Sequence, residues 1–233
     1  MKPISFSGPF VLVFLITVFM SCQPAKKQAE YTGKPYQDSV YQAGPQTIPG
    51  KLQCEYYDFG GEGIAFHDED SINSGSGRLN PANGTYLHEF RINEAVDISY
   101  TKFTEPPIDS TVYNLVQPEK NQLYVGWTKP GEWTKYTVNV NESGTYKLGL
   151  MYTSNKGGKI SLAVSDVDAT GAIEIPTTFA EADTVAWRQW HHWNYLEKMA
   201  QIKLEKGLQT ITLHTIENGD MNYDYISFER IKE

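Results

Sequence analysis

Hydrophobic and polar residues alternate along several short segments of this chain. In residues 133–140, Tyr136, Val138 and Val140 are apolar and the residues between them are polar. Residues 146–152 repeat the alternation after the turn sequence Glu142-Ser143-Gly144. A period of two is typical of strands with one buried face, and two such runs around a short turn predict a hairpin. Further segments that suit strands are residues 52–57, 96–99, 122–127, 160–164, 208–215 and 225–228.

The spacing of these segments predicts the fold class. They recur every 10 to 15 residues with Gly, Asn and Pro between them, and aromatic residues make up 13% of the chain. Aromatic and β-branched residues favour strands, so we expect an all-β protein with a jelly-roll β-sandwich. Residues 193–204 (WNYLEKMAQIKL) remain ambiguous, because propensity favours a helix whereas the aromatic residues just before them favour a strand.

The N-terminal residues have the pattern of a targeting segment. Lys2 precedes an apolar run at residues 9–20, which is too short to span a bilayer and suits the hydrophobic region of a secretory signal. Ser21-Cys22 and the polar residues after them resemble a bacterial lipoprotein signal, in which the cysteine carries the lipid. We therefore expect a signal peptide at 1–21, lipidation of Cys22, a flexible linker at 22–48 and one folded domain at 49–233. The alternative is an ordinary secretory signal in which Cys22 has no role.

Charge and motifs exclude several functions. The net charge of −8 disfavours nucleic acid and anionic membranes as partners, so we expect membrane contact only through the lipid anchor. The glycine motifs of dinucleotide and P-loop sites are absent, as are HExxH and GxSxG. Glycoside hydrolysis needs two carboxyl groups across a cleft, and no pair of acidic residues has that signature. We expect no enzymatic activity.

Four motifs in order resemble one known family. They are IPGKLQCEYYDFGGEGIAFHDED (48–70), FRINEAVDI (90–98), VGWTKPGEWTKYTVNV (125–140) and MNYDYISF (221–228). Together they resemble the family 6 carbohydrate-binding modules over residues 48–231. The resemblance implies a jelly-roll β-sandwich and a sugar-binding cleft at its loop end.

The resemblance also implies which residues bind sugar. Sugar rings have apolar faces that stack on aromatic side chains, and a few polar groups fix their hydroxyls. In this sequence the two stacking rings correspond to Trp127 and Trp190, and the amide corresponds to Asn222. Trp187 is expected to add a subsite. The alternative is that these tryptophans are core residues, which is the role we expect for Trp133 and Trp193.

Two departures from the family pattern concern the cleft. Three tryptophans of residues 187–193 (WRQWHHW) compete for two family positions, and Trp190 and Trp193 fit better than Trp187 and Trp190 when counted back from Gly207. Residues 71–89 and 102–120 form longer loops than the family requires, so we expect them to reshape the cleft.

The resemblance further implies a structural calcium ion. The expected ligands are Gln53, Glu55 and Asp224, because calcium prefers several oxygen ligands. Cys54 is expected to be a small buried hydrophobic residue. The acidic sequence of residues 67–70 is expected to form a solvated loop rather than a second metal site.

The sequence therefore predicts non-catalytic binding of a plant- or algal-type polysaccharide or oligosaccharide at the bacterial cell surface. Glycoside hydrolases acting nearby would be possible partners. The alternatives are a surface scaffold or adhesion protein with a vestigial cleft and, less favoured, a small glycoside-active enzyme.

The lipoprotein signal gives a first prediction. Expression in a bacterium should yield a chain that begins at Cys22 and carries acyl groups on that residue. Intact-mass and peptide mass spectrometry measure both features. An unmodified Cys22, or a mature chain that starts further along, would contradict the anchor.

Overall fold

Strands dominate the described part of the protein. The computed structural model describes residues 1, 30–104 and 106–232. Contacts divide the chain into Met1–Glu30 and Tyr31–Glu233, and the account below concerns the second unit. The predicted signal peptide and Cys22 lie outside the described residues. Among the residues described, no helix has the length and apolar character needed to cross a membrane.

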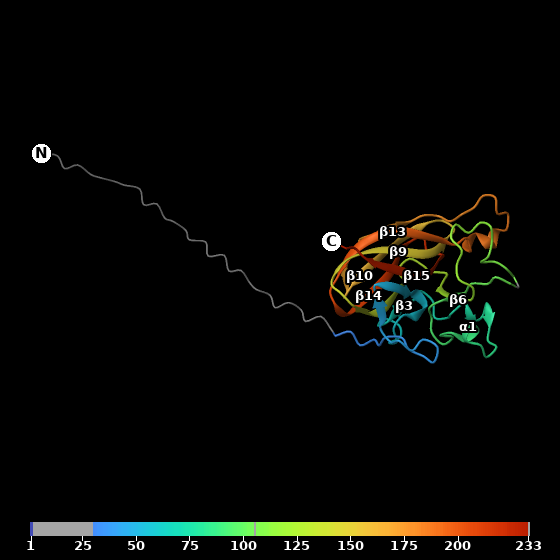
Figure 1. The fold of residues 1–233 in the computed structure, drawn as a ribbon, viewed down its shortest axis with the longest axis horizontal. Helices are drawn as coiled ribbons and strands as arrows, with labels where there is room; N and C mark the ends of the chain where they lie inside the picture. The colour runs from blue at the N-terminus through green and yellow to red at the C-terminus, as the bar shows by residue number, and fades with distance from the viewer. Residues whose placement is uncertain (2–29, 105, 233) are drawn as a thin grey trace. The chain divides into compact units, whose positions relative to one another are not determined.

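Two sheets form the framework of Tyr31–Glu233 (Figure 1). The seven-stranded sheet has the order β1 (Gln46–Ile48), β8 (Trp133–Val140), β14 (Gly207–Glu217), β10 (Gly158–Val164) and β11 (Val167–Asp168), with β3 (Phe66–His67) beside β8 and β12 (Ile173–Ile175) beside β10. The six-stranded sheet has the order β13 (Asn194–Leu204), β9 (Gly144–Ser154), β15 (Met221–Arg230), β7 (Leu123–Val125) and β6 (Ile98–Tyr100), with β2 (Gly50–Gln53) beside β15. The smaller elements are β4 (Ser76–Gly77), β5 (Asn80–Pro81), α1 (Tyr86–Glu89) and the 3-10 helices η1 (Cys54–Tyr56) and η2 (Ala186–Trp190).

Successive long strands lie in opposite sheets. β8, β10 and β14 belong to the seven-stranded sheet, whereas β9, β13 and β15 belong to the six-stranded sheet. The predicted β-sandwich is confirmed, but the hairpin predicted for β8 and β9 is wrong. Both strands have an apolar face for the same core, and they cover that core from opposite sides instead of pairing with each other. The short turn between them crosses from one sheet to the other.

The core lies between the inner faces of the sheets. The alternation in β8 places Tyr136, Val138 and Val140 inside, and Leu148 and Leu150 of β9 face them from the other sheet; all five are in one buried cluster. The ambiguous residues 193–204 form a strand, since β13 pairs antiparallel with β9 over most of its length. Pairing along β9 thus overrides helix propensity in this segment.

Two tryptophans expected in the core have different environments. Trp193 has no exposed surface and packs edge-on against Tyr124, as predicted. Trp133 is half-buried, pairs with His214 across β8 and β14, and lies on the outer face of its sheet, so its prediction as a core residue is wrong. The alternation explains the difference, because Trp133 lies an odd number of residues from Tyr136. Cys54 is fully buried, in η1 rather than in a strand.

The folded unit begins earlier than the predicted boundary at residue 49. β1 pairs in parallel with β8, and Tyr36 is 5% exposed. The Tyr36 ring stacks on Tyr56 at 5.3 Å and meets Phe90 at 5.5 Å. Residues 31–48 are therefore part of the compact unit, whereas the sequence predicted a linker up to residue 48. Scattered tyrosines in a segment without periodicity gave no sign of this packing.

The burial of Tyr36 gives a second prediction. Tyr36→Ala should lower the free energy of unfolding by about 3 kcal/mol, because it removes a buried ring from an aromatic cluster. Val40→Ala is the control, since Val40 is 61% exposed and its loss should cost less than about 0.5 kcal/mol. Urea denaturation measures both. Equal stability of the two variants would mean that residues 31–48 do not stabilise the sandwich.

Candidate functional site

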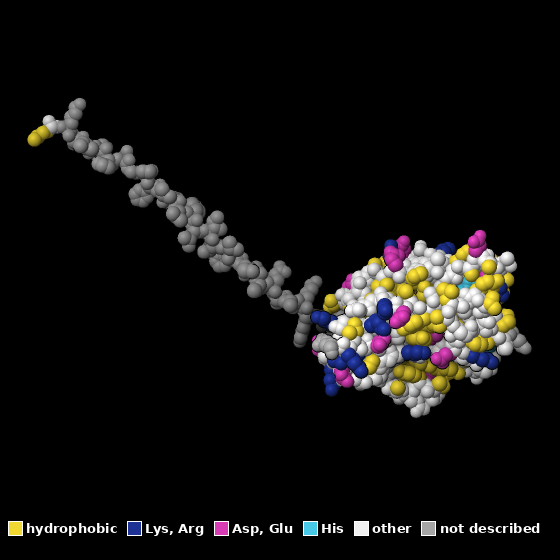
Figure 2. Space-filling view, turned by 45° about the horizontal axis from the view of Figure 1, so that its top comes forward, with side chains coloured by type: hydrophobic (Ala, Val, Ile, Leu, Met, Phe, Trp, Pro, Cys, Tyr) yellow, Lys and Arg dark blue, Asp and Glu magenta, His cyan; other side chains and the backbone are white. Residues whose placement is uncertain are grey.

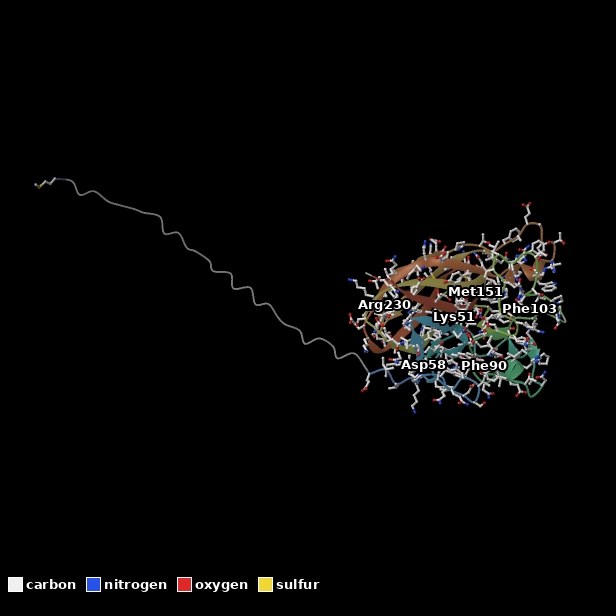
Figure 3. The ribbon with its side chains drawn as sticks, in the orientation of Figure 1. Lys51, Asp58, Phe90, Phe103, Met151 and Arg230 are labelled. Atoms are coloured by element: carbon white, nitrogen blue, oxygen red, sulfur yellow. The ribbon has the colours of Figure 1, made fainter. Side chains whose placement is uncertain are left out.

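A pocket of about 580 Å³ opens among the loops of the sandwich. Phe103, labelled in Figure 3 beside these loops, lies at the end of the molecule opposite Arg230 of β15. The structure brings the four residues predicted to bind sugar into this one pocket. It is lined by Leu79, Lys102, Pro106, Ile108, Trp127, Trp187, Trp190, His191, Asp220 and Asn222.

The two long loops contribute one wall of the pocket. Leu79 comes from residues 71–89, and Lys102, Pro106 and Ile108 come from residues 102–120. The expectation that these loops reshape the cleft agrees with their position. Tyr113 of the second loop donates a hydrogen bond to the carbonyl of Ala182 at 3.0 Å, and this contact joins the loop to the segment before η2. Figure 1 shows the green and orange loops together at this end of the sandwich.

Trp127 follows β7 in an unusual backbone conformation. Its φ is +48°, in the left-handed region that non-glycine residues rarely adopt. The preceding Gly126 leaves no room for a side chain, because a Cβ there would lie 2.8 Å from Asn222 Oδ1. A strained backbone of this kind often marks a functional site. Here it places a half-buried indole against the pocket.

Asn222 is buried at the start of β15 and is fixed by its amide nitrogen. Nδ2 donates to Thr153 Oγ1 at 2.9 Å and to the carbonyl oxygen of Trp190 at 2.8 Å. Thr153 Oγ1 donates to the same carbonyl at 2.7 Å. Both amide hydrogens are thus engaged, so the amide oxygen is the group that can accept a hydrogen bond from a ligand. The bond to the Trp190 carbonyl also links the amide to the backbone of a residue whose ring is a candidate for stacking.

The 3-10 helix η2 carries Trp187 and Trp190. Asp183 holds this helix: its carboxylate accepts two bonds from Arg188, at 2.6 and 2.7 Å, and lies 2.8 Å from His192 Nε2. The Arg188 guanidinium beside Asp183 holds the pKa of that carboxyl well below its usual range. Trp187 is 54% exposed, so its ring is open to solvent at the pocket.

A second buried carboxylate joins the loop of residues 102–120 to β13. Asp109 accepts hydrogen bonds from the backbone N–H of Lys102 at 2.7 Å and from the indole of Trp193 at 2.7 Å, and it lies 3.0 Å from His191 Nδ1. His191 and His192 therefore contact different carboxylates. Nothing in the sequence singles out Asp109, since two of its three partners, His191 and Trp193, lie far from it in the chain.

The predicted calcium ligands also lie together. Glu55 of η1 and Asp224 of β15 are buried, and Glu55 Oε2 and Asp224 Oδ1 have no hydrogen-bond partner among the described residues. Gln122 donates to Gln53 Oε1 at 3.3 Å and to Glu55 Oε1 at 3.1 Å. Burial raises the pKa of Asp224 to about 8, and burial followed by the charge of Asp224 raises the pKa of Glu55 well above its ordinary value. Unsatisfied buried carboxylate oxygens fit a hard cation.

Acidic residues elsewhere do not extend this site. Glu69 and Asp70 are exposed, as expected for a solvated loop, and Lys129 pairs with Asp70. His67 belongs to β3 and contacts Glu62, and Asp68 is half-buried, so this half of the segment is not the predicted solvated loop. In the described ranges, no group of three or more His, Cys, Asp or Glu side chains is arranged to hold a metal ion.

Comparison with known proteins places the chain in a family. The family model described as carbohydrate binding module (family 6) matches residues 107–230, more than half of the chain. The chain therefore belongs to carbohydrate-binding module family 6. No curated protein matches it.

Solved structures similar to this chain have low sequence identity to it. A β-1,3-glucan binding CBM6 from Bacillus halodurans is 13% identical and matches 79% of this chain and 98% of its own, with a TM-score of 0.46. CsCBM6-3 from Clostridium stercorarium, in complex with cellobiose, is 13% identical over 81% of this chain and 99% of its own, with a TM-score of 0.49. The C-terminal CBM6 of LamC from Zobellia galactanivorans is 21% identical over 47% of this chain and 82% of its own, with a TM-score of 0.39.

Sequence reasoning missed most of the remaining pocket residues. Lys102 lies in a segment that is notable in the sequence only for its loop length, and His191 lies in one that is notable only for its tryptophans. Asp220 precedes the Asn222 motif by two residues and carried no signal of its own. These side chains line the same pocket only because three loops come together in the folded protein.

Proposed function

We propose that this protein binds a polysaccharide or oligosaccharide, without catalysis, in the pocket between Trp127, Trp187 and Trp190. The observation that carries the proposal is the gathering of these three indoles and Asn222 at one pocket. A volume of about 580 Å³ has room for more than one sugar ring. The proposed site is the aromatic cleft that the sequence predicted.

Each group has a distinct part in the proposed binding. Trp127 and Trp190 stack on the apolar faces of a sugar ring, and the exposed Trp187 covers the next ring. Asn222 Oδ1 accepts a hydrogen bond from a sugar hydroxyl. Because hydrogen bonds on the Asn222 amide and on Asp183 already hold Asn222 and η2, little side-chain freedom is lost when the sugar binds.

Two acids at catalytic separation would be needed for glycoside hydrolysis. Asp220 is the one acidic residue that lines the pocket in the described part of the chain. A single carboxylate supplies neither a general acid with a base nor a nucleophile with an acid. This supports binding without turnover.

The pocket gives a third prediction. Trp127→Ala should weaken binding of the best glycan ligand about thirtyfold, or about 2 kcal/mol, because roughly 80 Å² of apolar stacking area is lost at about 25 cal/mol per Å². Asn222→Ala should reduce the free energy of glycan binding by about 1–3 kcal/mol, because it leaves a sugar hydroxyl unpaired and removes the hydrogen bond that holds Trp190. Calorimetric titration against xylan, β-glucan, agaran and mannan oligosaccharides measures each change.

Trp133→Ala is the matched control for these variants. Trp133 lies on the outer face of the seven-stranded sheet and does not line the pocket, so its loss should leave glycan affinity unchanged. If Trp133→Ala loses glycan binding while Trp127→Ala binds normally, the glycan site lies on the sheet face and not in the pocket. A pocket that no glycan enters would favour the alternative of a scaffold or adhesion protein with a vestigial cleft.

We also propose a structural calcium ion between Glu55 and Asp224, with Gln53 and backbone carbonyls completing its oxygen shell. The support is the pair of buried carboxylate oxygens without partners. An ion there would balance the charge of two carboxylates whose ionisation burial disfavours. It would also join η1 to β15. Asn222, the proposed sugar-binding amide, lies on β15 two residues before Asp224.

This site gives a fourth prediction. Calcium at about one hundred times its Kd should stabilise the metal-free protein by about 2.7 kcal/mol. That corresponds to a rise in Tm of roughly 5–10 °C for a domain of this size. Glu55→Gln should reduce the rise, while Glu181→Gln, on an exposed residue, should keep it. An equal Tm in calcium and in chelator, starting from demonstrably metal-free protein, would remove the ion.

The proposed location is the bacterial cell surface or the periplasmic side of a membrane. The lipid on Cys22 would anchor the chain there, and secreted glycoside hydrolases acting on the same glycan would be functional partners. Support comes from the signal-like residues 1–21 and the lipoprotein-type cysteine.

A further inference from the structure

Lys102 lines the sugar pocket, and it follows a different strand than Trp127 does. β6 and β7 are antiparallel, with Ile98 opposite Val125 and Tyr100 opposite Leu123. Lys102 follows one end of this pair and Trp127 follows the other end. The Lys102 side chain runs back along β6, since its Nζ lies 3.2 Å from Ser99 Oγ. The backbones of the two residues are therefore at opposite ends of the strand pair, and both side chains line the pocket.

The Lys102 ammonium has only uncharged partners. Besides Ser99 Oγ, it lies 3.4 Å from the carbonyl oxygen of Tyr100 and 4.3 Å from the centre of the Tyr100 ring. Within the described ranges, no carboxylate lies within 4.0 Å of it, whereas Lys51, Lys129, Lys135, Lys147 and Lys159 each have an acidic partner. Burial lowers the pKa of Lys102, which shows that the nearby charge of Asp109 does not fully compensate its desolvation.

Among the described residues, the other charged groups at or near the pocket are Asp109, Arg188 and Asp220. The Asp109 carboxylate is fully buried and accepts bonds from the Lys102 backbone and Trp193. Arg188 is paired with Asp183. Asp220 reaches the pocket with Asn222, from the start of β15. Within the part of the chain that the structure describes, the pocket lining thus contains one lysine without an acidic partner, Lys102, and one acidic residue, Asp220.

We propose that the glycan bound in this pocket carries a carboxylate or sulfate group, and that the Lys102 ammonium pairs with that group. This inference rests on the proposed function. An ammonium has three donors, and the two neutral contacts of Lys102 leave one for a ligand. An anion would supply the missing countercharge in a partly desolvated place, where ion pairs are stronger than in water. Asp220 repels the same group, so the charged substituent points toward Lys102 and fixes the direction of the sugar.

Matched ligand pairs test this inference. A β-1,4-mannuronate hexamer and β-1,4-mannohexaose share linkage and ring configuration and differ by the carboxylate. A κ-carrageenan hexasaccharide and its desulfated form differ by the sulfate. Calorimetric titration of the full chain should show at least a tenfold preference for one anionic member over its neutral partner at low salt. This preference should fall as salt rises.

Three variants assign the preference to one side chain. Lys102→Met should bring the ratio of the two affinities to about one, and Lys102→Arg should keep a preference because the charge remains. Lys203→Met is the control for net charge, since Lys203 is exposed on β13 and does not line the pocket, and the preference should be unchanged.

If the neutral sugars bind as tightly as their anionic counterparts, the charge assignment is wrong and the proposed function is unaffected. A preference that survives Lys102→Met would also overturn the charge assignment. Absence of binding to every member of both pairs overturns this inference, and the Trp127→Ala comparison decides the proposed function separately.

Discussion

Each sheet buries one face against the other, and this shared core determines where the strands and their connecting loops lie. Strands β8, β9 and β10 alternate between sheets because each has an apolar face that must reach the same core. Every connection between them consequently crosses an end of the sandwich. Loops from distant parts of the sequence meet there, and the pocket lies where three of them converge.

Buried polar groups then give the loops a fixed shape. Asp109 joins the loop of residues 102–120 to Trp193, Asp183 holds η2, and Asn222 fixes the carbonyl of Trp190. Removing a partner from such a group leaves a buried polar atom unsatisfied, which costs more than the hydrogen bond contributes. The aromatic rings are therefore held before any ligand arrives. Rigid rings suit stacking on sugars, whose individual contacts are weak.

The surface and the pocket differ in how their charges are arranged. On the face that Figure 2 shows, Lys and Arg side chains lie among Asp and Glu side chains without a large block of either sign. Exposed pairs of this kind contribute little to stability. Lys102 differs because it is partly buried and lacks an acidic partner among the described residues. A charge in that position affects ligand choice more than it affects the fold.

Period-two alternation and the family motifs are local signals, so the sequence alone predicted most strand segments and the β-sandwich. It also singled out Trp127, Trp190, Trp187 and Asn222, which the structure brings to one pocket. Tertiary structure decided the rest. It placed β8 and β9 in different sheets and Trp133 on an outer face. It also packed Tyr36 into the folded unit, and it brought Lys102, His191 and Asp220 to the pocket. These outcomes depend on contacts between residues far apart in the chain, and no local pattern of hydrophobic and polar residues specifies them.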